Sequence, residues 1–139
     1  MRILVDTNVF IDLILKREPF FEDDVKFLNI CRANRHQIYI SAMSFRDIEY
    51  VIRKQIQDKR EVKHILNKIY CLVTKIIPIT ADDAINTLFD YEKDFEDYLL
   101  ACSCETAMLD CLVTNNEKDF KHPRVIVLSV KKFNEINSQ

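Results

Sequence analysis

Short apolar runs alternate along the chain with longer segments whose apolar residues recur at helical spacing. The short runs predict strands over residues 3–5, 37–40, 75–79, 111–114 and 125–129. The longer segments predict helices over residues 9–15, 20–34, 41–56, 59–73 and 94–109, another that opens at residue 80, and a last one over 131–136. Strands separated by helices imply right-handed parallel crossovers. The pattern therefore predicts a three-layer α/β/α sandwich with a central parallel sheet of four to five strands.

No linker, repeat or low-complexity segment interrupts this pattern. The three prolines, Pro19, Pro78 and Pro123, lie at joints between periodic segments. A chain of 139 residues has the usual size of one domain. We therefore expect residues 1–139 to form a single domain.

Composition removes several classes of function. The chain has no glycine, so it cannot form a P-loop, a dinucleotide-binding fingerprint, a kinase glycine loop or a hydrolase nucleophile elbow. Turns must then use Asn, Asp, Ser and Pro. With a formal net charge of -2, any binding of nucleic acid must depend on a local surface rather than on overall attraction.

The five cysteines match no zinc or redox spacing and are predicted to be small buried residues. Reduced thiols, no export signal and no apolar run near the ~18 residues of a membrane span predict a cytoplasmic protein that makes no contact with a membrane. The three histidines are scattered, and we expect each to be a surface residue.

Acidic residues follow the strands at the edge where parallel sheets carry their active crevice. Asp6 closes the first predicted strand, where it is either a helix cap or a chemical group. Asp97 shares a helical stripe with Leu100 and Cys104, so its charge needs a partner. Nearby acids leave few local bases to pair with it, which favours a bound cation.

The helix after the second strand offers two further acids, Asp47 and Glu49. Glu49 lies nearer the apolar stripe of that helix, so periodicity alone favours it, and the choice stays open. After the fourth strand, Asn116 and Asp119 offer oxygen ligands in what is otherwise a polar turn. Oxygen ligands without His or Cys indicate Mg²⁺ or Mn²⁺ rather than zinc.

Four segments in this order resemble the motifs of PIN-domain ribonucleases. They are ILVDTNVFID at 3–12, ISAMSFRDIEY at 40–50, DFEDYLLA at 94–101 and LVTNNEKDF at 112–120. Small stand-alone members of this family are toxins of the VapC type. The resemblance covers essentially the whole chain and implies the PIN fold, with its Rossmann-like topology.

The resemblance also implies a metal-dependent endoribonuclease, the toxin of a toxin–antitoxin pair, held inactive by an antitoxin and commonly a homodimer. It implies that Asp6, Asp47 and Asp97 hold the metal. Asp47 stands where most relatives carry Glu, and Asn116 where many carry a fourth Asp. Because an amide has no charge to hold a second cation, occupancy by two metals is in doubt, and Asp119 is a partial substitute.

Hydrolysis of an RNA phosphodiester needs an activated water and positive charge on the transition state. We therefore expect Mg²⁺ (or Mn²⁺) on Asp6 and Asp97, with Asp47 completing its shell and Asn116 or Asp119 positioning water or a second ion. Thr7, Asn8 and Thr114 are candidates for orienting phosphate or water. Six Lys and Arg face two acids over residues 53–68, which is either a track for RNA phosphates or an ordinary solvated helix face.

Three other functions are alternatives to the nuclease. A haloacid-dehalogenase-like phosphatase needs a second Asp two residues after the first, where this chain has Asn8. A phosphate-accepting receiver domain needs an Asp at the end of its third strand, where this chain has Thr80. The third alternative is a PIN-like module with weak or lost metal binding that acts in RNA or protein binding, and Asn116 supports it.

Overall fold

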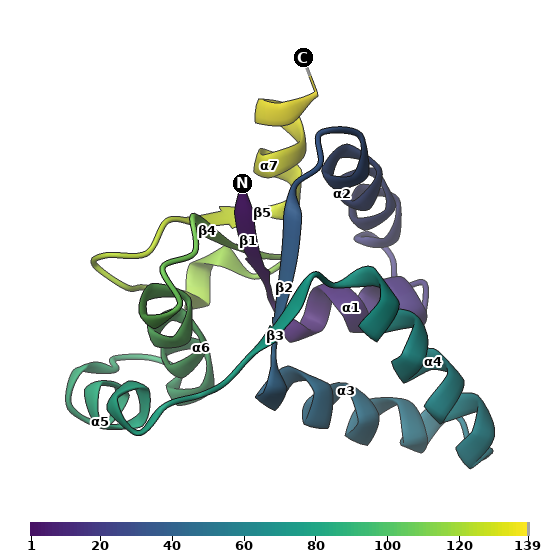
Figure 1. Ribbon diagram of the computed structural model, residues 1–139, viewed down its shortest axis with the longest axis horizontal. Coiled ribbons are helices and arrows are strands. Elements are labelled where there is room, and N and C mark those ends of the chain that lie inside the picture. Colours follow the sequence, from purple (N-terminus) through teal and green to yellow (C-terminus); the bar gives the residue numbers. More distant parts are fainter. Residues whose placement is uncertain (139) are drawn as a thin grey trace.

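The computed structural model describes residues 1–138, and in this range it has one parallel sheet with the strand order β3-β2-β1-β4-β5 (Figure 1). The strands are β1 (Arg2–Val5), β2 (Gln37–Ser41), β3 (Lys75–Ile77), β4 (Cys111–Thr114) and β5 (Val127–Ser129). The predicted parallel sheet and α/β architecture are thus confirmed. Two strands are shorter than expected. Strand β3 ends before Pro78 because proline has no N–H to donate to the ladder. Strand β5 starts at Val127, two residues later than predicted.

Helices join these strands in the predicted order. They are α1 (Thr7–Ile14), α2 (Phe21–Ala33), α3 (Ala42–Gln55), α4 (Lys59–Leu72), α5 (Ala81–Asp90), α6 (Phe95–Thr106) and α7 (Val130–Asn137), and a 3-10 turn, η1 (Glu117–Asp119), follows β4. Helix α6 ends three residues before the expected Leu109. The chain reverses there through Met108, which has φ 54° and is 74% exposed.

Left-handed turns in this glycine-free chain use unexpected residues. Within residues 1–138, positive φ occurs at Lys16 (51°), Arg35 (57°) and Met108 (54°). None of these is Asn, Asp or Ser, the types expected to replace glycine. A long side chain costs more than glycine in this region, so these three turns are held by the elements around them.

The core has two parts because successive side chains of a strand point to opposite faces of the sheet. Ile3 and Val5 of β1 pack on one face with residues of α1, α2, α3, α4 and α7. Leu4 packs on the other face with Leu100 and Cys104 of α6, and α5 lies outside α6 (Figure 1). The predicted three layers are therefore present.

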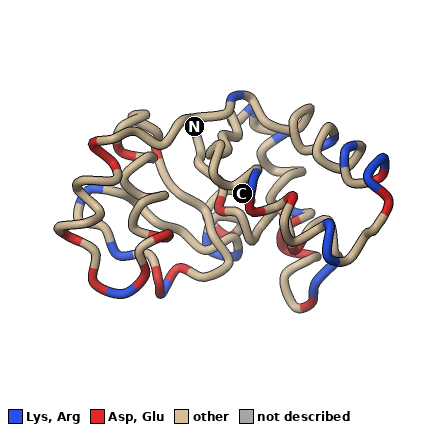
Figure 2. The backbone as a smooth tube through the Cα atoms, turned by 90° about the horizontal axis from the view of Figure 1, so that it is seen from below, with Lys and Arg blue, Asp and Glu red and all other residues tan. Residues whose placement is uncertain are grey.

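Charge is unevenly distributed over this frame. Lys and Arg recur along the arm formed by α3 and α4, whereas acids gather on the side of α5 and α6 (Figure 2). Among residues 1–138, no helix is both long enough and apolar enough to cross a membrane.

Candidate metal and nuclease site

Asp6 lies where the carboxyl ends of β1 and β4 meet. Its backbone N–H continues the parallel ladder by donating to Val113 O at 2.9 Å. Asp6 is the residue before α1, yet its side chain makes no capping hydrogen bond. Instead the carboxylate accepts a hydrogen bond from Thr114 Oγ1 at 2.8 Å. Asp6 therefore occupies the N-cap position of α1, while its carboxylate is bound by the Thr114 hydroxyl.

The Asp6 carboxyl group is held in an environment that disfavours its charge. The residue is only 4% exposed. Burial raises its pKa to about 6, against the opposing effect of the Thr114 hydrogen bond. A carboxylate buried in this way is stabilised by a nearby positive charge.

Asp6 lines a cavity of about 230 Å³ together with side chains from α1, α3 and α6. The polar and aromatic residues that line it are Asp6, Thr7, Asn8, Asp47, Tyr50, Glu96 and Asp97. The structure therefore brings five of the predicted site residues to one cavity. Tyr50 and Glu96 were not predicted, because nothing in the local pattern distinguishes them from other exposed residues.

Helix α3 contributes a face that the apolar periodicity does not reveal. Met43, Asp47, Tyr50 and Val51 line the cavity, and their spacing of four, three and one places them on one side of a helix. Glu49 instead borders a separate groove between α3 and α4, where it pairs with Arg53 at 3.4 Å. The interpretation that favoured Glu49 from periodicity is thus wrong about which acid faces Asp6 and Asp97.

Two further contacts hold the start of α3. Ser41 caps it by accepting from Met43 N at 3.2 Å, and Thr7 Oγ1 donates to Ser44 Oγ at 2.7 Å. The Thr7 hydroxyl thus ties α1 to α3 at the cavity. Asp47 is 28% exposed and forms an ion pair with Arg46 at 3.3 Å.

Asp97 reaches the cavity from the first turn of α6, which Asp94 caps by accepting from Asp97 N at 3.0 Å. Burial raises the pKa of the Asp97 carboxyl group to about 7, and the charges of Asp6, Asp94, Asp119 and Glu96 add to that effect. The neighbouring charges that raise this pKa are thus acidic, and a cation beside Asp97 would stabilise its charged form.

The loop after β4 lies beside the cavity rather than in its lining. Thr114 Oγ1 accepts from Asn116 N at 3.0 Å, and the Asn116 amide donates to the Asp119 carboxylate. Asn116 is exposed and Asp119 is half-buried. The charge of Asp119 helps to raise the pKa of Asp97. Asn116 is connected to the site only indirectly, by its hydrogen bonds to Thr114 and Asp119.

Oxygen donors dominate this site, as a hard divalent cation requires. Within residues 1–138, however, no three His, Cys, Asp or Glu side chains lie close enough together to hold a metal ion. The donor types nevertheless fit Mg²⁺ or Mn²⁺, and a cation would relieve the repulsion that the charge of Asp6 exerts on Asp97. Within residues 1–138, the carboxylates of Asp6, Asp47 and Asp97 line the same cavity without forming a compact set of metal ligands.

A second pair of buried acids lies behind the site and was not predicted. Asn115 Nδ2 donates to Asp12 Oδ2 at 3.0 Å and to Asp24 Oδ1 at 3.0 Å. Asp12 is 4% exposed and Asp24 is fully buried. Burial raises the pKa of both, that of Asp24 to about 7. One amide thus joins α1, α2 and the loop that carries Asn116, and local sequence gives no signal for it.

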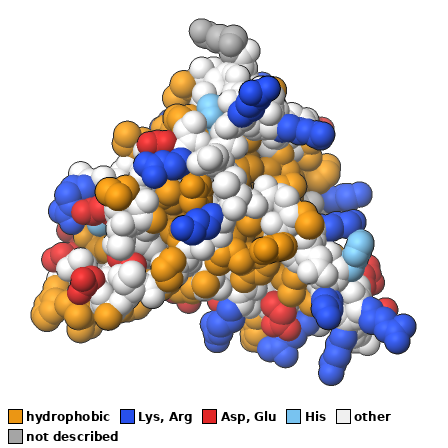
Figure 3. Space-filling view, in the orientation of Figure 1, with side chains coloured by type: hydrophobic (Ala, Val, Ile, Leu, Met, Phe, Trp, Pro, Cys, Tyr) orange, Lys and Arg blue, Asp and Glu red, His pale blue; other side chains and the backbone are white. Residues whose placement is uncertain are grey.

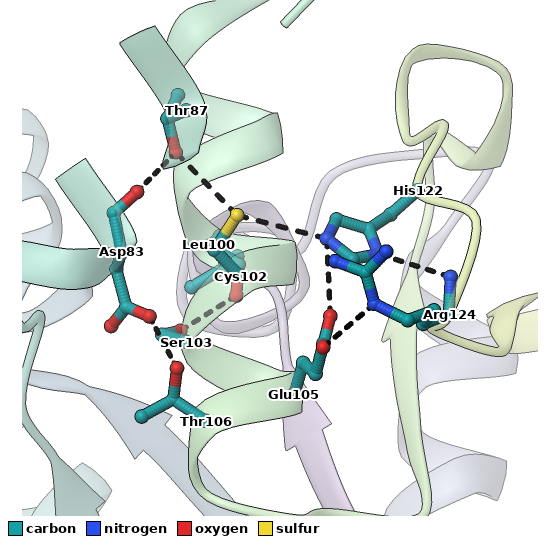
Figure 4. A network of polar contacts seen from close by, with 9 residues as sticks. All are labelled: Asp83, Thr87, Leu100, Cys102, Ser103, Glu105, Thr106, His122 and Arg124. Atoms are coloured by element: carbon teal, nitrogen blue, oxygen red, sulfur yellow. Dashed lines mark hydrogen bonds and ion pairs between the residues drawn. The ribbon is translucent and has the colours of Figure 1, made fainter. Parts of the chain in front are cut away.

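A network of polar contacts holds the end of that loop to α6 (Figure 4). The His122 side chain is 1% exposed, and its Nε2 lies 3.4 Å from Glu105 and 3.7 Å from Cys102 Sγ. Burial lowers the pKa of His122 and so favours the neutral ring, against the opposing effect of the Glu105 charge. The prediction that every histidine is a surface residue is therefore wrong for His122.

The cysteines are predicted to be buried. That prediction is confirmed for four of the five and is wrong for Cys71, which is exposed.

A family model of the PIN domain matches residues 2–118. The chain belongs to the PIN-domain family. The match begins at β1 and extends into η1, so it includes Asp6, Asp47, Asp97 and Asn116, and the resemblance seen in the four motifs is confirmed. Asp119 lies one residue beyond it.

Three known proteins are similar to this chain, one in sequence and two in fold. The chain is 26% identical to Ribonuclease VapC1 of Aquifex aeolicus (strain VF5), over 96% of this chain and 94% of that protein. VapBC2 from Rickettsia felis, solved bound to a DNA fragment from its promoter, shares the fold with a TM-score of 0.67 at 20% identity, covering 93% of this chain and 98% of that one. FitAB bound to the IR36 DNA fragment shares the fold with a TM-score of 0.70 at 20% identity, covering 92% of this chain and 94% of that one.

Proposed function

We propose that this PIN-domain protein is a metal-dependent endoribonuclease, the toxin of a toxin–antitoxin pair. The observation that carries the proposal is that Asp6, directly after β1, lines one cavity with acids of α3 and α6, where the charge of Asp6 disfavours that of Asp97. Family membership and the likeness to a VapC ribonuclease support the reaction class. RNA is the substrate in this proposal.

Asp6, Asp47 and Asp97 would hold Mg²⁺ (or Mn²⁺). When bound, such an ion supplies positive charge for the phosphoryl transition state and an activated water. The raised pKa values of Asp6 and Asp97, about 6 and about 7, mean that these carboxyl groups are charged in mildly alkaline solution. Ligation therefore competes with protons below neutral pH.

Hydroxyl and amide groups of this chain would orient the substrate. Thr114 donates to Asp6 Oδ2 and so restrains the orientation of that carboxylate. Thr7 and Asn8 line the cavity at the start of α1, where helix N–H groups favour an anion such as phosphate. Asp119, oriented by the Asn116 amide, would position water or a second cation beside Asp97.

Cleavage of total RNA by the purified protein tests this proposal. We expect fragments with Mg²⁺ or Mn²⁺, none with EDTA, and at least a ~100-fold loss of rate in Asp6→Asn, which keeps the shape but not the charge. Glu92→Gln, an exposed acid outside the cavity, is the matched control and is expected to cleave normally. Full activity of Asp6→Asn would refute the assigned site.

A second candidate is a PIN module that binds RNA or protein without cleavage. It is favoured by the separation of the acidic side chains within residues 1–138 and by the uncharged Asn116. Calorimetric titration with Mn²⁺ separates the two candidates. Binding by the wild type that is lost in Asp97→Asn supports the nuclease, and no binding by either supports the inert module.

Partners follow from the same proposal. The two structural neighbours are named as VapBC2 and FitAB complexes on DNA, so we propose a cognate antitoxin for this chain and a cytoplasmic location. A homodimer is supported by α5, where Ile85, Leu88 and Phe89 are 50%, 63% and 78% exposed. Their spacing puts all three on one face of the helix, and such an apolar face is typical of an interface.

A further inference from the structure

The arm formed by α3 and α4 carries an excess of positive charge next to the acidic cavity. Residues 53–68 contain six Lys and Arg against two acids. All six basic residues are exposed: Arg53, Lys54, Lys59, Arg60, Lys63 and Lys68. Figure 3 shows basic side chains gathered around the end of this arm.

A groove runs between the two helices of the arm. It has a volume of about 490 Å³ and is lined by the cations Arg53, Lys59 and Lys63 and by the apolar side chains Ile56, Val62 and Leu66. Cations above an apolar floor suit a ligand with both charged and flat apolar parts. Nucleic acid strands have both, because phosphates alternate with bases.

Tyr50 connects this arm to the acidic cavity. Its ring lines the cavity and is 48% exposed. Lys54 Nζ lies 4.1 Å from the ring centroid, and the Arg53 guanidinium carbon lies 5.3 Å from it. Arg53 and Lys54 are therefore held against an aromatic ring that borders the proposed cleavage site.

We propose that single-stranded RNA leaves the acidic cavity over Tyr50, with one base stacked on that ring and the following phosphates on Arg53, Lys54 and Lys63. The inference rests on the proposed function, because it takes the cavity to be where the strand is cut. A single strand is favoured over a duplex because stacking needs an exposed base face. The ring distinguishes RNA from an acidic peptide, which needs only the cations.

Glu49 limits this surface in the free protein. Its carboxylate pairs with Arg53 Nε at 3.4 Å, and both side chains are about half exposed, 41% and 57%. A phosphate must compete with that carboxylate for the guanidinium. Removing the Glu49 charge is therefore expected to strengthen the binding of RNA.

Binding is tested with a fluorescent 12-nucleotide RNA by anisotropy in EDTA, where no cleavage occurs. We expect Tyr50→Ala to weaken binding about 5- to 150-fold, the usual range for one stacked base, and Tyr50→Phe to retain it. Lys54→Gln and Lys63→Gln should each flatten the plot of log affinity against log salt by about 0.7. Lys26→Gln on α2 and Lys131→Gln on α7 remove exposed lysines elsewhere and should change neither quantity.

Two further measurements extend the test. Glu49→Gln is expected to bind RNA several-fold more tightly. Inorganic polyphosphate, which has no bases, should lose affinity in Lys54→Gln but not in Tyr50→Ala. Equal loss for both ligands in Tyr50→Ala, or equal effects of the arm lysines and the control lysines, would overturn the proposed path.

Cleavage assays on the same variants separate this inference from the nuclease proposal. Metal-dependent cleavage that is insensitive to Tyr50→Ala, Lys54→Gln and Lys63→Gln would overturn the path and leave the nuclease in place. The expected binding pattern without any cleavage would support the path and refute the nuclease.

Discussion

Asp97 illustrates how a single carboxyl group can oppose folding in the absence of a cation. Its pKa is raised to about 7 by burial and by four neighbouring acids, well above the ordinary value of 3.8. Between these two values the folded state binds more protons than the unfolded state. The free energy of unfolding therefore falls as the pH rises from about 4 to about 7.

Asp97→Asn is expected to raise the free energy of unfolding in EDTA at pH 8 by about 1 kcal/mol, because the uncharged amide removes this repulsion. The gain should vanish near pH 2 to 3, below both pKa values, where the wild-type group is protonated in the folded and the unfolded state. Urea unfolding at the two pH values measures it, with the exposed Glu92→Gln as control. A destabilised Asp97→Asn at pH 8 would contradict the repulsive environment.

Thr114 acts on the neighbouring carboxylate. Its hydroxyl favours the charged form of Asp6, whose pKa is about 6. In Thr114→Val that pKa should rise, so the acidic limb of the cleavage pH profile should move up by as much as about one unit. Rate measurements from pH 5 to pH 9 test this, with the exposed Thr74→Val as control. An unshifted limb combined with a uniformly lower rate would indicate loss of packing instead.

Elements meet at the site through a few side chains rather than through the sheet alone. Thr7 ties α1 to α3 through Ser44, and the contacts of His122 tie the loop after η1 to α6. Asn115 ties α1, α2 and the loop after β4 by donating to Asp12 and Asp24. Each contact joins segments that are distant in sequence, so each affects the cavity as a whole.

Asn115→Ala is expected to lower the free energy of unfolding by about 1–3 kcal/mol at pH 8, because two buried carboxylates lose their common donor. The loss should be smaller at pH 5. There Asp24, with a pKa of about 7, is protonated and needs the amide less. Denaturant unfolding of Asn115→Ala beside Asn67→Ala, an exposed residue on α4, measures the difference. An equal loss at both pH values would show that the amide acts by packing alone.

The whole molecule presents three unlike surfaces: the acidic cavity, the basic arm of α3 and α4, and the apolar face of α5. The first two lie next to each other at Tyr50. The third lies on the outside of α6 and takes no part in the candidate site. An exposed apolar face of this kind favours association between copies of the chain.

Leu88→Lys and Phe89→Lys are expected to convert a wild-type dimer into a monomer, because either change places a charge in the apolar contact. Light scattering after gel filtration measures the mass. Ile126→Lys is the matched control, since Ile126 is 63% exposed but lies outside α5. A monomeric wild type, or a dimer unaffected by both α5 variants, would refute this interface.

Local pattern was sufficient for the order of strands and helices, the parallel sheet, and the placing of Asp6 and Asp97 near its carboxyl edge. These features depend on periodicity and on strand ends, which are properties of neighbouring residues. The choice between Asp47 and Glu49, the burial of His122, and the amide between Asp12 and Asp24 depended on the tertiary structure. Each is set by how a helix is rotated against the sheet or by contacts across about 20 to 100 residues, and no local periodicity encodes these.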